Sequence, residues 1–215
     1  MSMLVTLAQA AGMAYATGIN LYGTIGIIGV ASKLAQIDSL PPNLAGVTSW
    51  WAISIALIFT VIELVISLVP SIASIWETLH SFIKPSVAAA LAAAIAWHGD
   101  PLFVLFAALI GGSLAITTHT TKLGLRYVIN ASPEPFSSGL MIIGEFGLVT
   151  IISITLWQHP FVTLLFALVV LVLVIVMVRL IWRTLCQVFS GHWVPRREFF
   201  QEARTSDRLE RRGDD

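Results

Sequence analysis

The chain has 215 residues, of which 57% are hydrophobic and only 11% are charged, and its mean hydropathy is +0.87. Soluble globular domains carry roughly 25% charged residues, so this chain has under half the usual supply of charge. The composition therefore excludes a soluble enzyme, a nucleic-acid-binding protein and a disordered chain, and it places the protein in a lipid bilayer.

The formal net charge of zero hides an uneven distribution. Residues 1–178 contain four basic and six acidic side chains, whereas residues 179–215 contain eight arginines and six acids. We interpret residues 1–185 as one transmembrane domain and residues 186–215 as a charged, partly disordered cytoplasmic tail. The single Cys186 excludes an intramolecular disulfide, and the first residues lack the basic region of a cleavable signal.

Apolar stretches long enough to cross a bilayer, about 20 residues, predict the first helices. Residues 2–32 predict one span, and residues 48–70 predict the second. Over residues 71–84, apolar and polar side chains alternate at helical spacing, which predicts a helix lying in the membrane interface. The alanine-rich residues 86–97 predict a short, closely packed third span, with one arm of a re-entrant hairpin as the alternative.

Three further spans are predicted in the second half. Residues 102–126 form one uninterrupted helical stretch, and residues 137–157 and 161–178 follow after turns. The fold class is therefore an all-α integral membrane protein with about six transmembrane helices plus one interfacial amphipathic helix. Six spans and an arginine-rich cytoplasmic tail predict that the N- and C-termini are both cytoplasmic, with Lys33 outside.

The two halves, residues 1–98 and 101–178, predict an inverted 3+3 repeat. The first helix of each half has a polar stretch, the second has one carboxylate, and the third is purely apolar. Three spans per half give the halves opposite orientations, which is a common plan in transporters.

Glu63 and Glu145 are the first candidates for function, because an uncompensated carboxylate in a span costs about 2.5–3.5 kcal/mol. Both lie about 10 Å from the predicted cytoplasmic boundary, so we expect them to face one another across the bundle. A close pair would hold a proton or share a cation. The structural alternative is that each carboxyl group is neutral or hydrogen-bonded and only locks helices together.

Polar residues of the first and fourth spans complete the predicted site. Asn20 lies among glycines, which indicates either close helix packing or a discontinuous helix whose backbone lines a cavity. Lys122 either pairs with a carboxylate or extends to the lipid phosphates. The threonine hydroxyls either contact a ligand or bond to carbonyls of their own helix. The predicted site for a small solute, proton or cation consists of Glu63, Glu145, Asn20, Thr17, Thr118, Thr121, His119 and Lys122.

Enzyme motifs are missing from the sequence. It contains no H-E-x-x-H zinc motif, no G-x-S-x-G elbow and no cysteine nucleophile in a polar setting. His98 and His159 lie in predicted turns, where they act as helix caps rather than as haem ligands. We therefore expect neither an enzyme nor a bound metal or cofactor.

Several segments carry a family resemblance. They are G-M-A-Y-A-T-G-I-N-L-Y-G-T at residues 12–24, the spacing from Glu63 to Pro70, W-E-T at residues 76–78 and T-T-K-L-G-L-R at residues 120–126. Over about residues 8–185 the chain resembles bacterial membrane proteins of the family named domain of unknown function 4126. The resemblance implies a multi-pass protein of the bacterial inner membrane and no established activity.

The leading functional prediction is a small transporter or channel-like permeation protein, present as a homo-oligomer among membrane lipids. Glu63 and Glu145 would carry protons or bind a cation, and Lys122 would supply a counter-charge. One alternative is a non-catalytic scaffold or accessory subunit that assembles through glycine and alanine faces. The other is a lipid-handling protein that acts through Lys84, Lys122 and Arg126.

Overall fold

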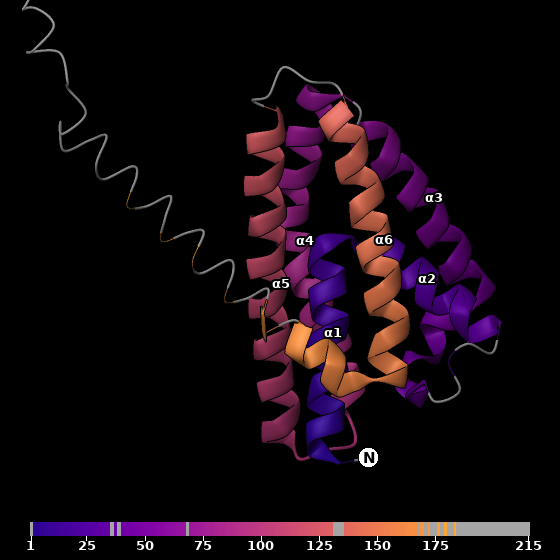
Figure 1. Cartoon of the computed structure of the whole chain (residues 1–215). Coiled ribbons are helices and arrows are strands. Elements are labelled where there is room, and N and C mark those ends of the chain that lie inside the picture. Colours follow the sequence, from indigo (N-terminus) through magenta and orange to yellow (C-terminus); the bar gives the residue numbers. More distant parts are fainter. Residues whose placement is uncertain are drawn as a thin grey trace, which may run out of the picture. The chain divides into compact units, whose positions relative to one another are not determined.

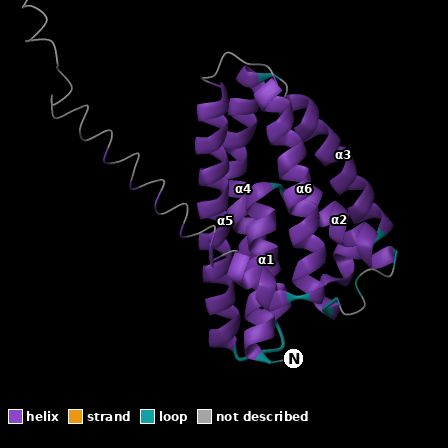
Figure 2. Cartoon of the chain, viewed as in Figure 1, coloured by secondary structure: helices purple, strands orange, loops and turns teal. Residues whose placement is uncertain are grey.

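The computed structural model describes residues 2–34, 37, 40–67, 69–130 and 136–166, and the single positions 168, 169, 172, 176, 179 and 183. Every regular element in these residues is helical, which confirms the all-α fold class (Figure 2). The chain divides into two compact units, Met1–Val172 and Leu173–Asp215. The predicted tail and much of the predicted span 161–178 lie outside the described residues, and only the first unit is considered below.

Among the described residues, four helices are long and apolar enough to cross a membrane. They are α3 (Trp50–Ser67), α4 (Pro70–Ala96), α5 (Pro101–Asn130) and α6 (Phe136–Gln158). Successive helices run in opposite directions, as Figure 1 shows. The α3–α4 connection therefore lies at one end of the bundle, which we call the Val69 end, and the α4–α5 turn lies at the other, which we call the His98 end. Six spans, as the sequence predicted, are not confirmed.

The first predicted span is instead a re-entrant helical hairpin. α1 (Met3–Ile19) and α2 (Leu21–Lys33) are separated by Asn20, whose backbone is extended at φ −144° and ψ 102°. α1 starts at the His98 end and stops partway along the bundle, and α2 then runs back toward the same end (Figure 1). Apolar residues of both arms share one core cluster, which contains Ala10 and Met13 of α1 and Ile28 and Ala31 of α2.

The hairpin corrects two sequence-based predictions. Residues 2–32 do not form a single span, because arms of 17 and 13 residues reach only about 26 and 20 Å, short of a bilayer core of about 30 Å. α1 begins at the His98 end and α2 ends there, so the start of α1 and Lys33 lie on the same side of the bundle. The prediction that they lie on opposite sides is wrong.

Asn20 explains why the chain reverses at this point. Its side-chain Oδ1 accepts a hydrogen bond from the Gly23 amide at 2.7 Å and so caps the first turn of α2. Ile19, Asn20 and Leu21 are all buried, which satisfies the rule that irregular backbone at membrane depth must be enclosed by protein. The discontinuous-helix interpretation of this segment is therefore correct.

The glycines of the hairpin also serve close packing. A Cβ atom at Gly18 would lie 2.8 Å from the carbonyl oxygen of Ala115 and would collide with Thr118, both on α5. A Cβ atom at Gly29 would lie 2.9 Å from the carbonyl oxygen of Val47. Small residues allow such close approach of backbones, so both interpretations of the glycine-rich stretch hold.

The predicted interfacial helix over residues 71–84 is wrong. This segment and the predicted short span 86–97 form one continuous helix, α4, with Pro85 inside it. Its two charged residues, Glu77 and Lys84, do not face lipid headgroups, because both are buried against other helices. Pro85 has no amide hydrogen, so the helix continues without the hydrogen bond that residue 85 would otherwise donate to the Ser81 carbonyl.

The alanine-rich half of α4 does pack closely, as predicted. Small residues from three helices meet there: Ala88 lies in one core cluster with Ala14 of α1 and Ala115 of α5. A Cβ atom at Gly111 of α5 would lie 2.6 Å from the Cβ of Ala92. The inverted repeat stays a prediction, although α4, the third helix of the first half, is not purely apolar.

Candidate functional site

Six charged side chains from four helices meet at the tip of the hairpin, and we call this group the charge cluster. α3 contributes one residue, α4 two, α5 two and α6 one. Its members are Glu63, Glu77, Lys84, Lys122, Arg126 and Glu145. Three carboxylates and three cations give a formal net charge of zero.

Lys122 lies at the centre of this cluster. Its Nζ lies 3.0 Å from Glu145 Oε2, 3.2 Å from Glu77 Oε1 and 3.5 Å from Glu63 Oε1. The same ammonium donates to the main-chain carbonyl of Ile19 at 3.1 Å. Pairing of Lys122 with a carboxylate, one of the two predicted outcomes, is therefore what the structure has. Glu63 and Glu145 do converge, but on a shared lysine rather than on each other.

Lys84 is the second buried cation and is fully enclosed, with 0% of its surface exposed. Its Nζ lies 3.2 Å from Glu63 Oε1 and 3.3 Å from Glu77 Oε2, and it also donates to the Ile19 carbonyl at 3.4 Å. Arg126 adds a contact of 3.0 Å to Glu77 Oε1. Each carboxylate of the cluster thus contacts at least one cation.

The Ile19 carbonyl is available to both lysines because the helix breaks at the next residue. In a continuous helix this oxygen would accept the amide of Gly23, but that amide is bound to the Asn20 side chain. The C-terminal end of a helix carries a partial negative charge, which favours nearby cations. The break therefore supplies the cluster with a main-chain acceptor, placed at the end of α1.

The cluster lies within the bundle and not at its edge. Along their helices, Glu77 and Lys122 lie seven and eight residues from the Val69 end, which is about 10–12 Å. Isolated ions in such surroundings would each cost several kcal/mol, and only good pairing makes them tolerable. The pairing of charges in the cluster is thus a condition for folding, and the cluster is also the candidate functional site.

A shell of polar side chains surrounds the ions. His119 Nε2 lies 3.0 Å from the Ser81 hydroxyl, and His119 Nδ1 lies 3.8 Å from Glu77 Oε2. His80 donates from Nδ1 to the Trp76 carbonyl at 2.7 Å, since a carbonyl can only accept. The other ring nitrogen of His80, Nε2, lies 3.0 Å from the Tyr22 hydroxyl.

Three buried atoms of the site have no hydrogen-bond partner among the described residues. They are Glu63 Oε2, Glu145 Oε1 and His119 Nδ1. Buried polar atoms are nearly always hydrogen-bonded, so each of these marks a position where a proton, water molecule or ligand group would complete the network.

The predicted neutral contacts have other partners. Thr17 donates to the Met13 carbonyl at 2.7 Å, and Thr121 donates to the Thr117 carbonyl at 2.7 Å. Thr118 likewise donates to the Leu114 carbonyl at 3.1 Å. These hydroxyl hydrogens are thus used within their own helices, which was one of the two predicted outcomes.

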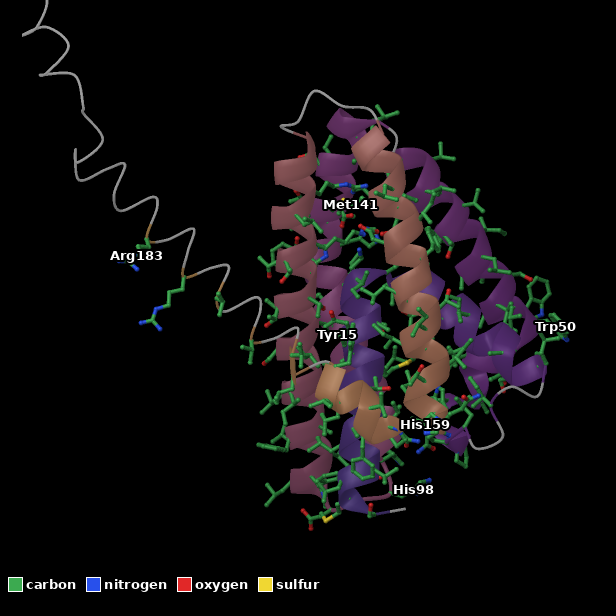
Figure 3. The ribbon with its side chains drawn as sticks, viewed as in Figure 1. Tyr15, Trp50, His98, Met141, His159 and Arg183 are labelled. Atoms are coloured by element: carbon green, nitrogen blue, oxygen red, sulfur yellow. The ribbon has the colours of Figure 1, made fainter. Side chains whose placement is uncertain are left out.

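A cavity of about 430 Å³ lies between α1, α5 and α6, directly beside the cluster. In Figure 3 its lining residues Tyr15 and Met141 lie at different heights along the bundle, while His98 and His159 lie together at the His98 end. Four predicted site residues line the cavity, and most of the remaining wall is apolar. The four are Thr118, Thr121, Lys122 and Glu145.

The site predicted from the sequence lacks three members of the charge cluster, Glu77, Lys84 and Arg126. Pro85 indicates a helix boundary, so Glu77 and Lys84 were assigned to the interfacial helix. The signal that could have found them is their spacing of seven residues, which places opposite charges on one face of a helix. An 18-residue window within residues 72–96 also has a mean hydropathy of 1.4, enough for a span.

Comparison with known protein families gives one match, which covers most of the chain. A family model described as "Domain of unknown function (DUF4126)" matches residues 7–180, which include α2 to α6 and all of α1 except its first four residues. No curated protein and no solved structure matches the chain. Within the described part of the chain, no group of three His, Cys, Asp or Glu residues could hold a metal ion.

Proposed function

We propose, for a chain that belongs to the DUF4126 family, that it is a small membrane transporter whose path passes the charge cluster. The observation that carries this proposal is the tip of the re-entrant hairpin. The break at Asn20 leaves the Ile19 carbonyl without its helical donor, and this oxygen accepts hydrogen bonds from Lys84 and Lys122. The same two lysines form salt bridges with the three carboxylates of the cluster. Broken helices that end on buried ions near the middle of a bundle are a recurrent feature of transporter sites.

Glu63 is the residue we assign to proton or cation exchange. Its Oε1 is shared between Lys84 and Lys122, while its Oε2 has no partner among the described residues. A proton on Glu63 would leave both lysines with Glu77, Glu145 and the Ile19 carbonyl, so the cations would keep acceptors. The cluster can therefore accept or release a charge at Glu63 without leaving a lysine unpaired.

Proton flux into proteoliposomes tests this proposal. The purified protein is reconstituted with a pH-sensitive dye inside, and valinomycin with a potassium gradient supplies the driving potential. Glu63→Gln and Glu145→Gln are each expected to reduce flux at least tenfold. Asp100→Asn is the matched control, because this carboxylate lies in an exposed turn away from the cluster. Unchanged flux in both cluster variants would contradict transport by this route.

One observation favours a scaffold as the second candidate function. Each carboxylate of the cluster contacts a cation, which is also how buried charges would lock helices together. A scaffold predicts no flux above that of empty liposomes, together with loss of stability in the same variants. Lipid handling loses support, because Lys84 and Lys122 are enclosed in ion pairs and α4 is not an interfacial helix.

The proposal includes further expectations about the protein in the cell. We place it in the cytoplasmic membrane of a bacterium as a homo-oligomer without enzymatic activity. The arginine-rich tail is proposed to be cytoplasmic, with residues 161–178 as a fifth span after α6. Because α1 and α2 form a hairpin, the start of α1 would then lie outside, which replaces the expectation that both termini are cytoplasmic.

A further inference from the structure

We propose that the cavity between α1, α5 and α6 binds an apolar molecule whose head group is a protonated amine, and that this ammonium donates to Glu145. The inference rests on the proposed function, since it names the substrate class of the same site. It is tested by binding, so that it can fail independently of transport.

The walls of the cavity select the body of the ligand. Its volume of about 430 Å³ lies within the range of about 300–1,000 Å³ that small organic ligands occupy. A strongly hydrated inorganic ion would lose its water of hydration in this cavity and would find too few polar groups to replace it. The rest of the wall is formed by Tyr15, whose ring is apolar but whose hydroxyl is polar, and by the apolar residues Ile19, Leu125, Leu140, Met141 and Leu148.

Apart from the Tyr15 hydroxyl, the polar groups of the wall have no hydrogen-bond donor to spare. Lys122 has three ammonium hydrogens, and four oxygen atoms already lie 3.0–3.5 Å from its Nζ. The hydroxyl hydrogens of Thr118 and Thr121 are donated to carbonyls of α5. A carboxylate or phosphate head group would therefore find a single hydroxyl donor, that of Tyr15, and would lie next to the charge of Glu145.

The polar atom of the wall that has no hydrogen-bond partner among the described residues is instead an acceptor. Glu145 Oε2 contacts Lys122 at 3.0 Å, whereas Glu145 Oε1 has no partner among the described residues. The Glu145 side chain is 13% exposed, so it reaches the cavity from the edge of the cluster. A ligand that donates to Oε1 would complete the hydrogen bonding of this carboxylate.

The charges favour an ammonium over a neutral hydroxyl as that donor. Lys122 is shared by three carboxylates, of which Glu145 has no other salt-bridge partner among the described residues. A second cation beside Glu145 would give this carboxylate a partner that it does not share, and it would bring the net charge of the cluster from zero to +1. Hydrogen bonds between ionised partners are roughly twice as strong as neutral ones.

Gly144 provides access and also a matched test. A Cβ atom at Gly144 would meet nothing within 4 Å, and this residue lines the cavity. Gly147, almost one turn further along α6, is equally open but lines a separate hollow with Thr60 and Leu64 of α3. The same bulky substitution can thus fill one space and leave the other empty.

Equilibrium binding of radiolabelled 2-phenylethylamine to the full-length protein in nanodiscs tests the ligand class. Binding is expected to be saturable at neutral pH. Unlabelled 2-phenylethanol should compete at least tenfold more weakly, and 3-phenylpropanoate should not compete. No saturable binding, or equal competition by the alcohol or the carboxylate, would overturn the inference.

Variants test the location. Gly144→Phe and Glu145→Gln should each weaken binding at least tenfold, while Gly147→Phe should bind as the wild type does. If Gly144→Phe does not fold, as judged by its melting temperature, Gly144→Leu and Glu145→Gln decide the question. Equal losses in the Gly144 and Gly147 variants would overturn the assignment. Amine binding without proton flux would support this site and contradict transport, and flux without amine binding would do the reverse.

Discussion

The ammonium of Lys122 donates to the main-chain carbonyl of Ile19 at 3.1 Å and so joins positions 103 residues apart in the chain. This contact depends on a third residue, because Asn20 takes the Gly23 amide that Ile19 would otherwise bind. The end of α1, the start of α2 and the centre of the charge cluster are therefore one structural unit. Substitutions in the hairpin should therefore perturb the ion pairs of the cluster, and substitutions in the cluster should destabilise the hairpin.

Lys122→Met should lower the free energy of unfolding by about 3–5 kcal/mol, because it leaves buried carboxylates without their central cation. Unfolding in detergent, followed by circular dichroism, measures the effect. The double variant Lys122→Met/Glu145→Met should recover part of the loss, since it restores a net charge of zero. Lys33→Met is the control, as Lys33 is exposed. A double variant less stable than the single one would contradict this account.

Asn20→Ala should destabilise the protein by about 0.5–2 kcal/mol, because the Gly23 amide loses its acceptor at the start of α2. Asn20→Ser should retain much of the stability, since serine also caps helices. The exposed Asn43→Ala serves as the reference in the same melting experiment. If the alanine and serine variants were equally unstable, capping would not be the role of Asn20.

Gly18→Ala should destabilise the protein by about 1–3 kcal/mol, because its new Cβ would overlap Thr118 and approach the Ala115 carbonyl to 2.8 Å. Gly124→Ala on α5 makes the same change where nothing lies within 4 Å. That variant should be more stable than the wild type by roughly 0.5–1 kcal/mol, as alanine favours a helix over glycine. Equal melting temperatures for the two variants would argue against the α1–α5 contact.

Cysteine labelling should place both ends of the hairpin on one side of the membrane. In a Cys186→Ser background, Ser2→Cys and Lys33→Cys should react with an impermeant maleimide from the same side, and Val69→Cys from the opposite side. All three positions are exposed. A continuous first span, as the sequence predicted, would instead put Ser2 and Lys33 on opposite sides.

Much of the candidate site was predictable, and the reason is energetic. Charged residues within a span are rare and costly, so Glu63, Glu145 and Lys122 could be recognised without any structure. Their mutual contacts could not be derived, because each pairing depends on how far four helices are rotated and shifted. Glu77 and Lys84 were missed since Pro85 is a local signal for a helix boundary, which the tertiary packing overrides.

The sequence by itself determined the solvent and the class of the fold. A chain with 11% charged residues must lie in lipid, and in lipid an all-helical chain satisfies its backbone through bonds four residues apart. The direction of the chain after Asn20 was decided only by tertiary structure. The hydropathy of residues 2–32 is the same whether the helix continues or the chain turns back at Asn20. The lysines that stabilise the turn come from α4 and α5, more than sixty residues away in the chain.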